Sequence, residues 1–269
     1  MNITNLNKLK PKKLIVFDLD GTLAPSKSVM DTEMGNLMKD LLAVKKVAVI
    51  GGGKFALFEH QFLNELKVPE DLLKNLYLFP TTATTFLRYK NGWKKVYSHD
   101  LSKTQIDQIY SAFKSVFEEI GYVHPTKTYG NVIENRQTQV TWSALGQDIV
   151  AVLGKKGVEI KNKWRDEHTP LKLQIARALQ KRLPNLEVLA AGHTSIDITK
   201  KGIDKSYGLL QIEKYLKIKI ADMLFLGDAI FKGGNDYAIT KTSVDYCKVH
   251  DPEDTKKIIR HVLETTKPN

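Results

Sequence analysis

The chain has 269 residues, 42% hydrophobic and 26% charged, which is ordinary for a globular protein with one large or two modest domains. Its single cysteine, Cys247, rules out an internal disulfide and is compatible with a reducing compartment. The formal net charge of +11 leaves nucleic acid, an anionic membrane or an anionic small molecule as possible partners.

Two features of the chain reduce the number of possible partners. Met1–Lys13 has several lysines but no apolar stretch typical of a signal peptide, and no later run approaches the roughly 20 apolar residues of a membrane-spanning helix. The densest basic cluster, between Lys155 and Arg165, lacks the interleaved aromatic residues of a single-strand binder apart from Trp164. We therefore expect a cytoplasmic monomer or homodimer with no membrane contact and no specific nucleic-acid partner.

The first predicted element is a buried strand that ends in carboxylates. Leu14–Phe17 is a continuous apolar run, typical of a strand covered on both faces in a parallel sheet. Asp18 and Asp20 follow it on one face, and Gly21 lets the backbone turn. Two adjacent carboxylates repel unless a cation offsets their charge, and oxygen ligands favour Mg²⁺. A strand end before a turn also attracts Asp and Gly without any metal.

A helix and a second strand come next. Asp31 is placed to cap an amphipathic helix, and Val47–Ile50 reads as another buried strand. That strand runs into Gly51, Gly52 and Gly53, before a helix with Phe58 and Phe62 on its inner face. The free amides of this turn could hold a phosphate, although a triple glycine also marks a simple tight turn.

The middle of the chain changes character after a third strand. The predicted elements are a strand at Leu76–Phe79, a long helix that Ser102 starts, a half-exposed antiparallel strand at Asn131–Ser143, a helix at about Leu171–Leu183, and paired strands at 186–191 and 194–199. This order predicts an α+β insert over residues 86–192. A parallel α/β core would then comprise residues 1–85 and 193–269.

The last part of the chain repeats the pattern of a buried strand followed by an acidic residue. A helix begins near Lys205, and the buried strand Met223–Leu226 ends in Gly227-Asp228. The loop that follows carries Asn235 and Asp236. A strand at Val244–Val249 and a helix capped by Asp251-Pro252 complete the chain.

Residues 17–23, Phe-Asp-Leu-Asp-Gly-Thr-Leu, resemble the first motif of the haloacid dehalogenase-like phosphohydrolases. Further stretches in the same order extend the resemblance over nearly the whole chain. It implies a Rossmann-like parallel-sheet core with an inserted IIB-type cap. It also implies that Asp18 is a nucleophile that forms an aspartyl-phosphate, that Asp20 is the general acid and base, and that Lys205 contacts the phosphate and the nucleophile.

The resemblance extends to a metal site. Residues 227–236 resemble the acidic fourth motif of that superfamily. This implies Mg²⁺ bound by Asp18, the backbone carbonyl of Asp20, and Asp228. Asn235 and Asp236 are then expected to orient ligands and metal-bound waters.

Within the superfamily, the chain most resembles the phosphomannomutase branch. At the second motif, the superfamily usually supplies a Ser or Thr to the phosphoryl group. This chain has only the backbone amides of Gly52 and Gly53 there.

The insert resembles the phosphomannomutase cap in two places. Arg136 matches one phosphate-binding arginine of that cap, and Gln147 replaces a second. Asp148–Ile160 offers no clear counterpart of a third arginine. Ser195 and Asp197 match a segment that contacts the sugar, although an ordinary exposed strand face remains the alternative.

Three functions remain open. We expect a magnesium-dependent phosphatase for a small phosphorylated metabolite, most simply a sugar phosphate. The alternative is a phosphomannomutase or phosphoglucomutase, which must bind two phosphates and is disfavoured by the neutral Gln147. A non-catalytic basic binding protein is the third, and the presence of Asp18, Asp20 and Lys205 argues against it.

Overall fold

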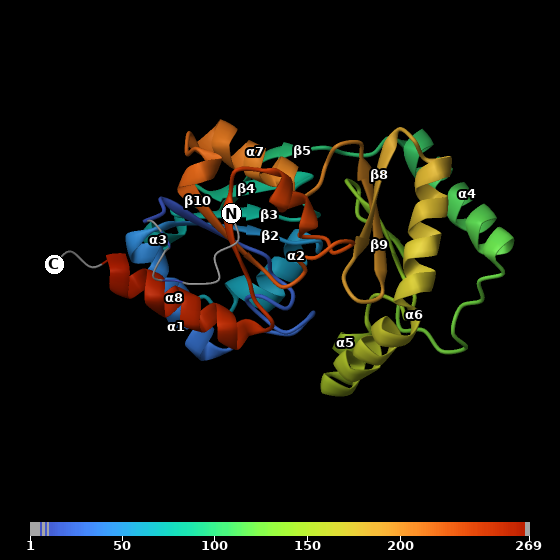
Figure 1. Cartoon of the computed structure of the whole chain (residues 1–269), viewed down its shortest axis with the longest axis horizontal. Helices are drawn as coiled ribbons and strands as arrows, with labels where there is room; N and C mark the ends of the chain where they lie inside the picture. The colour runs from blue at the N-terminus through green and yellow to red at the C-terminus, as the bar shows by residue number, and fades with distance from the viewer. Residues whose placement is uncertain (1–5, 7–8, 10, 267–269) are drawn as a thin grey trace. The chain divides into compact units, whose positions relative to one another are not determined.

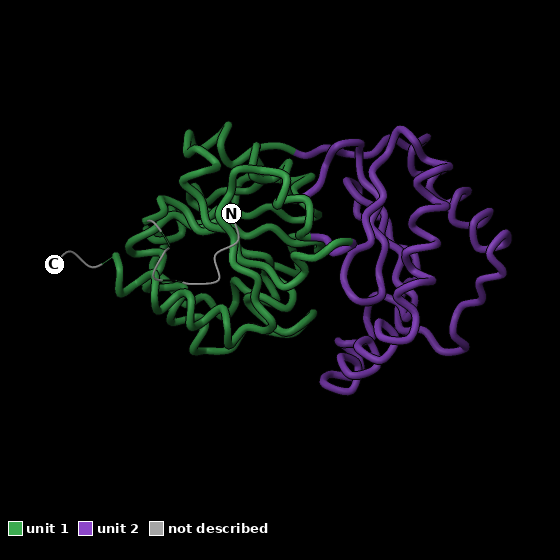
Figure 2. The backbone as a smooth tube through the Cα atoms, viewed as in Figure 1, with its two compact units in different colours: residues 1–97, 205–232, 236–269 green, residues 98–204, 233–235 purple. Residues whose placement is uncertain are grey.

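A computed structural model of the chain describes residues 6, 9 and 11–266. The chain divides into two compact units (Figure 2). The first comprises residues 1–97, 205–232 and 236–269, and the second comprises residues 98–204 and 233–235. Most of Met1–Lys13, to which the signal-peptide interpretation applies, lies outside the described residues.

The boundaries of the second unit differ from the predicted 86 and 192. It begins at Ser98 and continues to Asp204, with Gly233–Asn235 added. Residues 85–97 stay with the first unit because they form two more strands of its sheet. Residues 193–204 belong to the second unit because the strand Ser195–Lys200 completes its sheet.

The first unit is built on a seven-stranded sheet with the order β11-β10-β1-β2-β3-β4-β5 (Figure 1). The strands are β1 Leu14–Phe17, β2 Lys46–Ile50, β3 Leu76–Phe79, β4 Thr85–Tyr89, β5 Trp93–Ser98, β10 Met223–Gly227 and β11 Asp245–Lys248. The five from β11 to β3 pair in parallel, and β4 runs antiparallel to β3. The predicted buried strands and the α/β core are therefore confirmed.

Helices cover both faces of this sheet. The α-helices are α1 Thr32–Val44, α2 Phe55–Phe58, α3 Glu70–Leu73, α7 Lys205–Leu216 and α8 Pro252–Thr266, with a π-helical turn η2 Glu59–Leu63 and 3₁₀ turns η3 Ile220–Asp222 and η4 Tyr237–Lys241. The side chain of Asp31 accepts the Met34 N–H and caps α1 as predicted. Asp251 likewise accepts the Asp254 N–H at 3.0 Å at the start of α8.

Alternation along β1 shows how the layers form. Ile15 and Phe17 pack into one cluster with residues of α1, η2 and α8. Leu14 and Val16 pack into a second cluster with residues of α7. Because successive residues of a strand point to opposite faces, a continuous apolar run is what a doubly covered strand requires.

The second unit is a four-stranded antiparallel sheet with the order β6-β7-β9-β8, packed against helices. Its elements are α4 Lys103–Ile120, β6 Ile133–Asn135, β7 Val140–Ser143, α5 Ile149–Leu153, α6 Lys155–Arg182, β8 Leu186–Ala191 and β9 Ser195–Lys200. The predicted α+β character is confirmed. The single strand predicted over Asn131–Ser143 is wrong, because these residues form the hairpin β6-β7.

The long helix α6 is the largest departure from the predicted elements. It begins at Lys155, whereas the sequence predicted a helix only from about Leu171, and Pro170 lies inside it. The basic cluster between Lys155 and Arg165 lies on this helix. Within the described residues, no helix is long and apolar enough to cross a membrane.

Candidate active site

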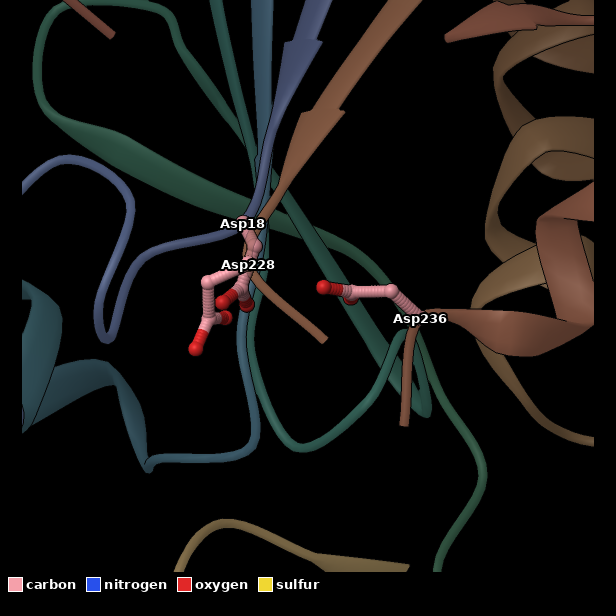
Figure 3. Close-up of side chains that lie close together, drawn as sticks. All are labelled: Asp18, Asp228 and Asp236. Atoms are coloured by element: carbon pink, nitrogen blue, oxygen red, sulfur yellow. The ribbon is translucent and has the colours of Figure 1, made fainter. Parts of the chain in front are cut away.

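Two neighbouring strands bring two carboxylates together. In the parallel pair β1-β10, Phe17 lies opposite Leu226, and the Asp18 N–H donates to the Leu226 carbonyl at 2.9 Å. Asp18 and Asp228 therefore leave adjacent strands at the same edge of the sheet, where ligands of open α/β sheets bind. Figure 3 shows the Asp236 side chain pointing toward both of them from the loop that precedes η4.

Gly21 lets the first of these strand ends pass close to the second. Its φ is +85°, and a Cβ placed on it would lie 2.7 Å from Asp228 Oδ2. Any side chain at residue 21 would thus displace the Asp228 carboxylate as well as strain the turn. The glycine predicted as a turn residue is also required by this close approach.

Lys205 is the central cation of the cluster. It is fully buried at the start of α7, and its Nζ donates to Asp18 Oδ1 at 2.5 Å and to Asp236 Oδ1. Burial alone would lower the pKa of Lys205, but Asp18 and Asp236 outweigh it and raise that pKa above its usual value. The lysine is therefore charged at neutral pH and offsets part of the negative charge around it.

Burial disfavours the ionised form of the carboxylates in this cluster. Burial raises the pKa of Asp18 well above its usual value against the opposing charge of Lys205, and Asp236 and Asp228 raise it further. Burial also raises the pKa of Asp228 to about 6, and Asp236 adds to this effect. One lysine does not balance three acids, so the cluster has net negative charge when all three are ionised.

This cluster fits a divalent cation. Asp18, Asp228 and Asp236 can each offer one carboxylate oxygen, and these oxygens all lie within 4.8 Å of one another. Carboxylate oxygens are the ligands that Mg²⁺ prefers. Asp236, which is predicted to orient ligands, lies in the cluster itself and accepts a hydrogen bond from Lys205. Asn235 is half-buried in the same loop, and its orienting role stays a prediction.

Asp20 lies beside the cluster and has its own partners. Its Oδ1 accepts the Lys27 N–H at 2.5 Å and the Gln61 side-chain amide at 3.1 Å. These donors come from the loop after β1 and from η2. The carboxylate of Asp20 is thus oriented by neutral N–H groups, whereas that of Asp18 is paired with a cation.

Backbone hydrogen bonds hold the glycine turn in place. The Gly51 N–H donates to the Phe79 carbonyl at 3.2 Å, so this amide continues the sheet. The Gly53 and Gly51 carbonyls accept the N–H groups of Thr81 and Thr82, each at 2.9 Å. Gly52 and Gly53 remain the predicted phosphate-binding amides of this turn.

The loop after β3 was not predicted to belong to the candidate site. Thr81, Thr82 and Ala83 are buried with φ values of 51°, 57° and 66°, a conformation that costs energy for residues with a Cβ. The Thr81 and Thr84 hydroxyls lie 2.5 Å apart. The run of threonines after Pro80 was the one signal in the sequence.

In the second unit, Arg136 and Gln147 contact each other. Arg136 Nη2 donates to Gln147 Oε1 at 2.9 Å, and Arg136 Nε donates to Glu134 Oε2 at 2.7 Å. The two positions paired by the sequence are therefore neighbours in space. Glu134 neutralises much of the charge that Arg136 would present to a phosphate.

Asp197 lies on the polar face of the second sheet. Ile196 and Ile198 pack into the core of this unit, so Asp197 points to the opposite face, where Oδ1 accepts the Thr141 hydroxyl at 2.8 Å. Asp197 is only 2% exposed, which excludes an ordinary exposed strand face for it. Ser195 is half-buried two residues earlier on the same strand.

Lys172 was missed by the sequence reasoning. Its Nζ is buried and donates to the Gly192 carbonyl at 2.7 Å, at the turn between β8 and β9. Burial lowers the pKa of Lys172 to about 8, against the opposing charge of Asp197. Nothing in the local sequence separates this lysine from the exposed ones on the same helix.

Known proteins resemble this chain along most of its length. The model of the haloacid dehalogenase-like hydrolases matches residues 15–265. A phosphomannomutase of Encephalitozoon cuniculi is 27% identical over 260 residues, covering 94% of each chain. A phosphomannomutase of Spinacia oleracea is 27% identical over 96% of this chain and 98% of its own. The solved IMP-nucleotidase of Plasmodium falciparum, at 15% identity, has the same fold, with a TM-score of 0.69 over 94% of this chain and 68% of its own.

Proposed function

We propose, since this chain belongs to the haloacid dehalogenase-like hydrolase family, that it transfers the phosphoryl group of a hexose phosphate through Asp18. The observation that carries the proposal is the Asp18 carboxylate, which is bound by the buried Lys205 and lies close to the carboxylates of Asp228 and Asp236. A nucleophile, a fixed cation and a set of metal ligands are the parts that phosphoryl transfer requires.

The residues of the cluster have separate tasks in this scheme. An oxygen of Asp18 attacks phosphorus and the bond to the sugar oxygen breaks, while Asp20 gives its proton to that leaving oxygen. Asp20 then takes a proton from the incoming hydroxyl or water as the aspartyl-phosphate breaks. The charge of Lys205 opposes the effect of burial, favours the ionised form of Asp18 for the attack, and stabilises the negative charge that develops on the phosphoryl oxygens.

The metal requirement follows from the acidic cluster. Asp18 and Asp228 would hold Mg²⁺ together with the Asp20 carbonyl, and Asp236 would position Lys205 and support these ligands. When bound, the ion screens repulsion between the nucleophile and a dianionic phosphate. The positive charge of the ion would likewise reduce the repulsion among the carboxylates of the cluster, whose pKa values are raised by burial.

The names of the relatives favour a mutase over the phosphatase expected from the sequence. The phosphomannomutases of Encephalitozoon cuniculi and Spinacia oleracea match this chain along almost their entire lengths. We therefore propose a phosphohexomutase as the first function. In this scheme Arg136, Gln147, Ser195 and Asp197 of the second unit contact the sugar and its second phosphate.

A phosphatase is the second candidate, and one contact favours it. Arg136 is bound by Glu134 and Gln147, so the region matched to the phosphate-binding arginines offers one arginine, already paired with a carboxylate. A weakly held second phosphate would let water reach the aspartyl-phosphate before the sugar returns.

A product assay separates the two functions. The protein is incubated with Mg²⁺ and a hexose 1-phosphate, with and without a hexose bisphosphate, and both isomerised sugar and inorganic phosphate are followed. A mutase gives isomerised sugar that depends on the bisphosphate, with little free phosphate. Release of phosphate as the main product would replace the mutase with the phosphatase. Absence of both products, with generic aryl phosphates also unreacted, would refute phosphoryl transfer.

A further inference from the structure

Gln61 is a fully buried polar side chain in a layer of apolar ones. It lies on the π-helical turn η2 between Phe58 and Phe62, both of which pack into the core of the first unit. Burying an amide costs free energy unless its hydrogen bonds are made. A glutamine at such a position therefore calls for a specific partner.

The partner is the carboxylate next to the nucleophile. Gln61 Nε2 donates to Asp20 Oδ1 at 3.1 Å and to the Ser28 carbonyl at 3.1 Å. Both are acceptors, which fixes the orientation of the amide with its nitrogen toward them. Gln61 Oε1 is buried and has no hydrogen-bond partner within the described residues. The side chain thus serves as a donor.

The hydrogen bond from Gln61 reaches an oxygen of Asp20 that also binds a second donor. The Lys27 N–H also reaches Oδ1, at 2.5 Å, so both donors meet at one oxygen of the carboxylate. Both N–H groups occupy Oδ1, and Oδ2 accepts neither of them. Two donors from different segments also fix the plane of the group.

The π-helical turn places Gln61 where it can do this. The Asn64 N–H bonds to the Glu59 carbonyl at 2.9 Å, five residues back, and the Gln61 carbonyl accepts the Met30 N–H at 2.8 Å. The backbone of the turn is therefore tied to the loop after β1 independently of the Gln61 side chain. π-Helical turns occur often at functional sites, where the extra residue redirects a side chain.

We infer that Gln61 is a positioning residue, which holds Asp20 so that Oδ2 delivers the proton to the leaving oxygen. The inference rests on the proposed phosphoryl transfer through Asp18. In the first half-reaction the proton on Oδ2 goes to the sugar oxygen as its bond to phosphorus breaks. In the second, Oδ2 takes the proton of the attacking hydroxyl or water.

The test uses the dependence on the leaving group. A sugar alkoxide leaves poorly and needs the proton, whereas 4-nitrophenolate leaves without it. Gln61→Met keeps the size of the side chain and removes the donor. We expect it to slow single-turnover phosphorylation by a hexose phosphate about 10- to 100-fold with KM within about twofold, whereas the first-turnover release of 4-nitrophenolate stays within about twofold of the unmodified protein.

Two further variants make the result decisive. Gln61→Glu also removes the amide donor and should spare the nitrophenyl substrate in the same way, so it serves if Gln61→Met does not fold. Asn75→Leu removes a different amide, which donates to the Leu42 carbonyl at 3.0 Å at the opposite end of β3, and should affect both substrates alike.

Equal slowing of both substrates by the Gln61 variants, or no slowing, would overturn the positioning role. That outcome differs from failure of the proposed function, in which Asp18→Asn would retain the activity of the unmodified protein.

Discussion

Lys205 is the single residue on which the candidate site depends most. Its ammonium group is fully buried between Asp18 and Asp236. A buried pair is costly to form, but the cost of removing one partner is larger because the other charge is left unpaired. Here the loss of one lysine would leave two carboxylates unpaired.

We expect Lys205→Met to destabilise the first unit by about 3–5 kcal/mol in urea unfolding without Mg²⁺. Adding Asp236→Asn should recover part of this loss, because the two substitutions act on one interaction. Lys257→Met is the control: this lysine is 69% exposed and pairs with Asp254, so its loss should change the free energy of unfolding far less. Simple additivity of Lys205→Met and Asp236→Asn would show that the buried contact contributes nothing specific.

Some residues of the site can be predicted from the sequence, and others cannot. Asp18 and Asp228 were predictable, because each follows a continuous apolar strand and parallel strands end at one edge. The pairing of Lys205 with Asp236 was not, since it depends on how the loop after β10 returns. Gln61 was hidden for a different reason: a lone polar residue on a helix is usually solvent-facing. Its position three residues after Phe58 was the available signal.

At the scale of elements, α4 illustrates a helix whose start is determined locally. The Ser102 hydroxyl accepts the Gln105 N–H at 3.1 Å, and the Gln105 side chain accepts the Ser102 N–H at 2.9 Å. This reciprocal pair forms a capping box, which satisfies two N–H groups that the helix leaves open.

Ser102→Ala should therefore lower the free energy of unfolding of the second unit by about 1 kcal/mol. Unfolding can be followed by the fluorescence of Trp142 and Trp164, which are buried in that unit. Ser102→Thr keeps the acceptor and should change stability much less. If Ala and Thr had equal effects, the hydroxyl would not be the stabilising group.

Predicted and observed elements differ where the chemistry of the turn is atypical. In β6-β7, Gln137 adopts a φ of 69° and the Arg136 N–H bonds to the Gln139 carbonyl at 2.7 Å. Glutamine rarely takes that conformation, so the residue at this position of the turn gave no signal of a hairpin. In α6, Pro170 lies in the interior and charged residues dominate the first half, which obscured the helical period.

At the scale of the whole molecule, the acidic cluster links stability to pH and to metal. The folded pKa of Asp228 is about 6, above its ordinary value of 3.8. The folded state therefore binds more protons than the unfolded state between these values, so the contribution of Asp228 to stability falls as pH rises through this window. Carboxylates with lowered pKa, such as Asp254 at about 2, act below that window.

Without Mg²⁺, the unmodified protein should lose roughly 1–3 kcal/mol relative to Asp228→Asn as pH rises from about 4 to 7. Thermal unfolding of both proteins in a chelating buffer measures this difference. Mg²⁺ should raise the Tm of the unmodified protein at pH 7.5 more than at pH 5, because protons compete for the same oxygens. A Tm difference that does not vary with pH would contradict the buried acidic cluster.

The central claim is that Asp18 carries the phosphoryl group, and the direct measurement is to locate that group on the chain. The protein is mixed with Mg²⁺ and a hexose phosphate, quenched in acid within one turnover, digested, and analysed by mass spectrometry. The account predicts one phosphoryl group on the peptide that contains Asp18. It also predicts no such adduct in Asp18→Asn, with turnover reduced by about a thousandfold or more. Turnover that persists in Asp18→Asn, or phosphate bound to another residue, would contradict it.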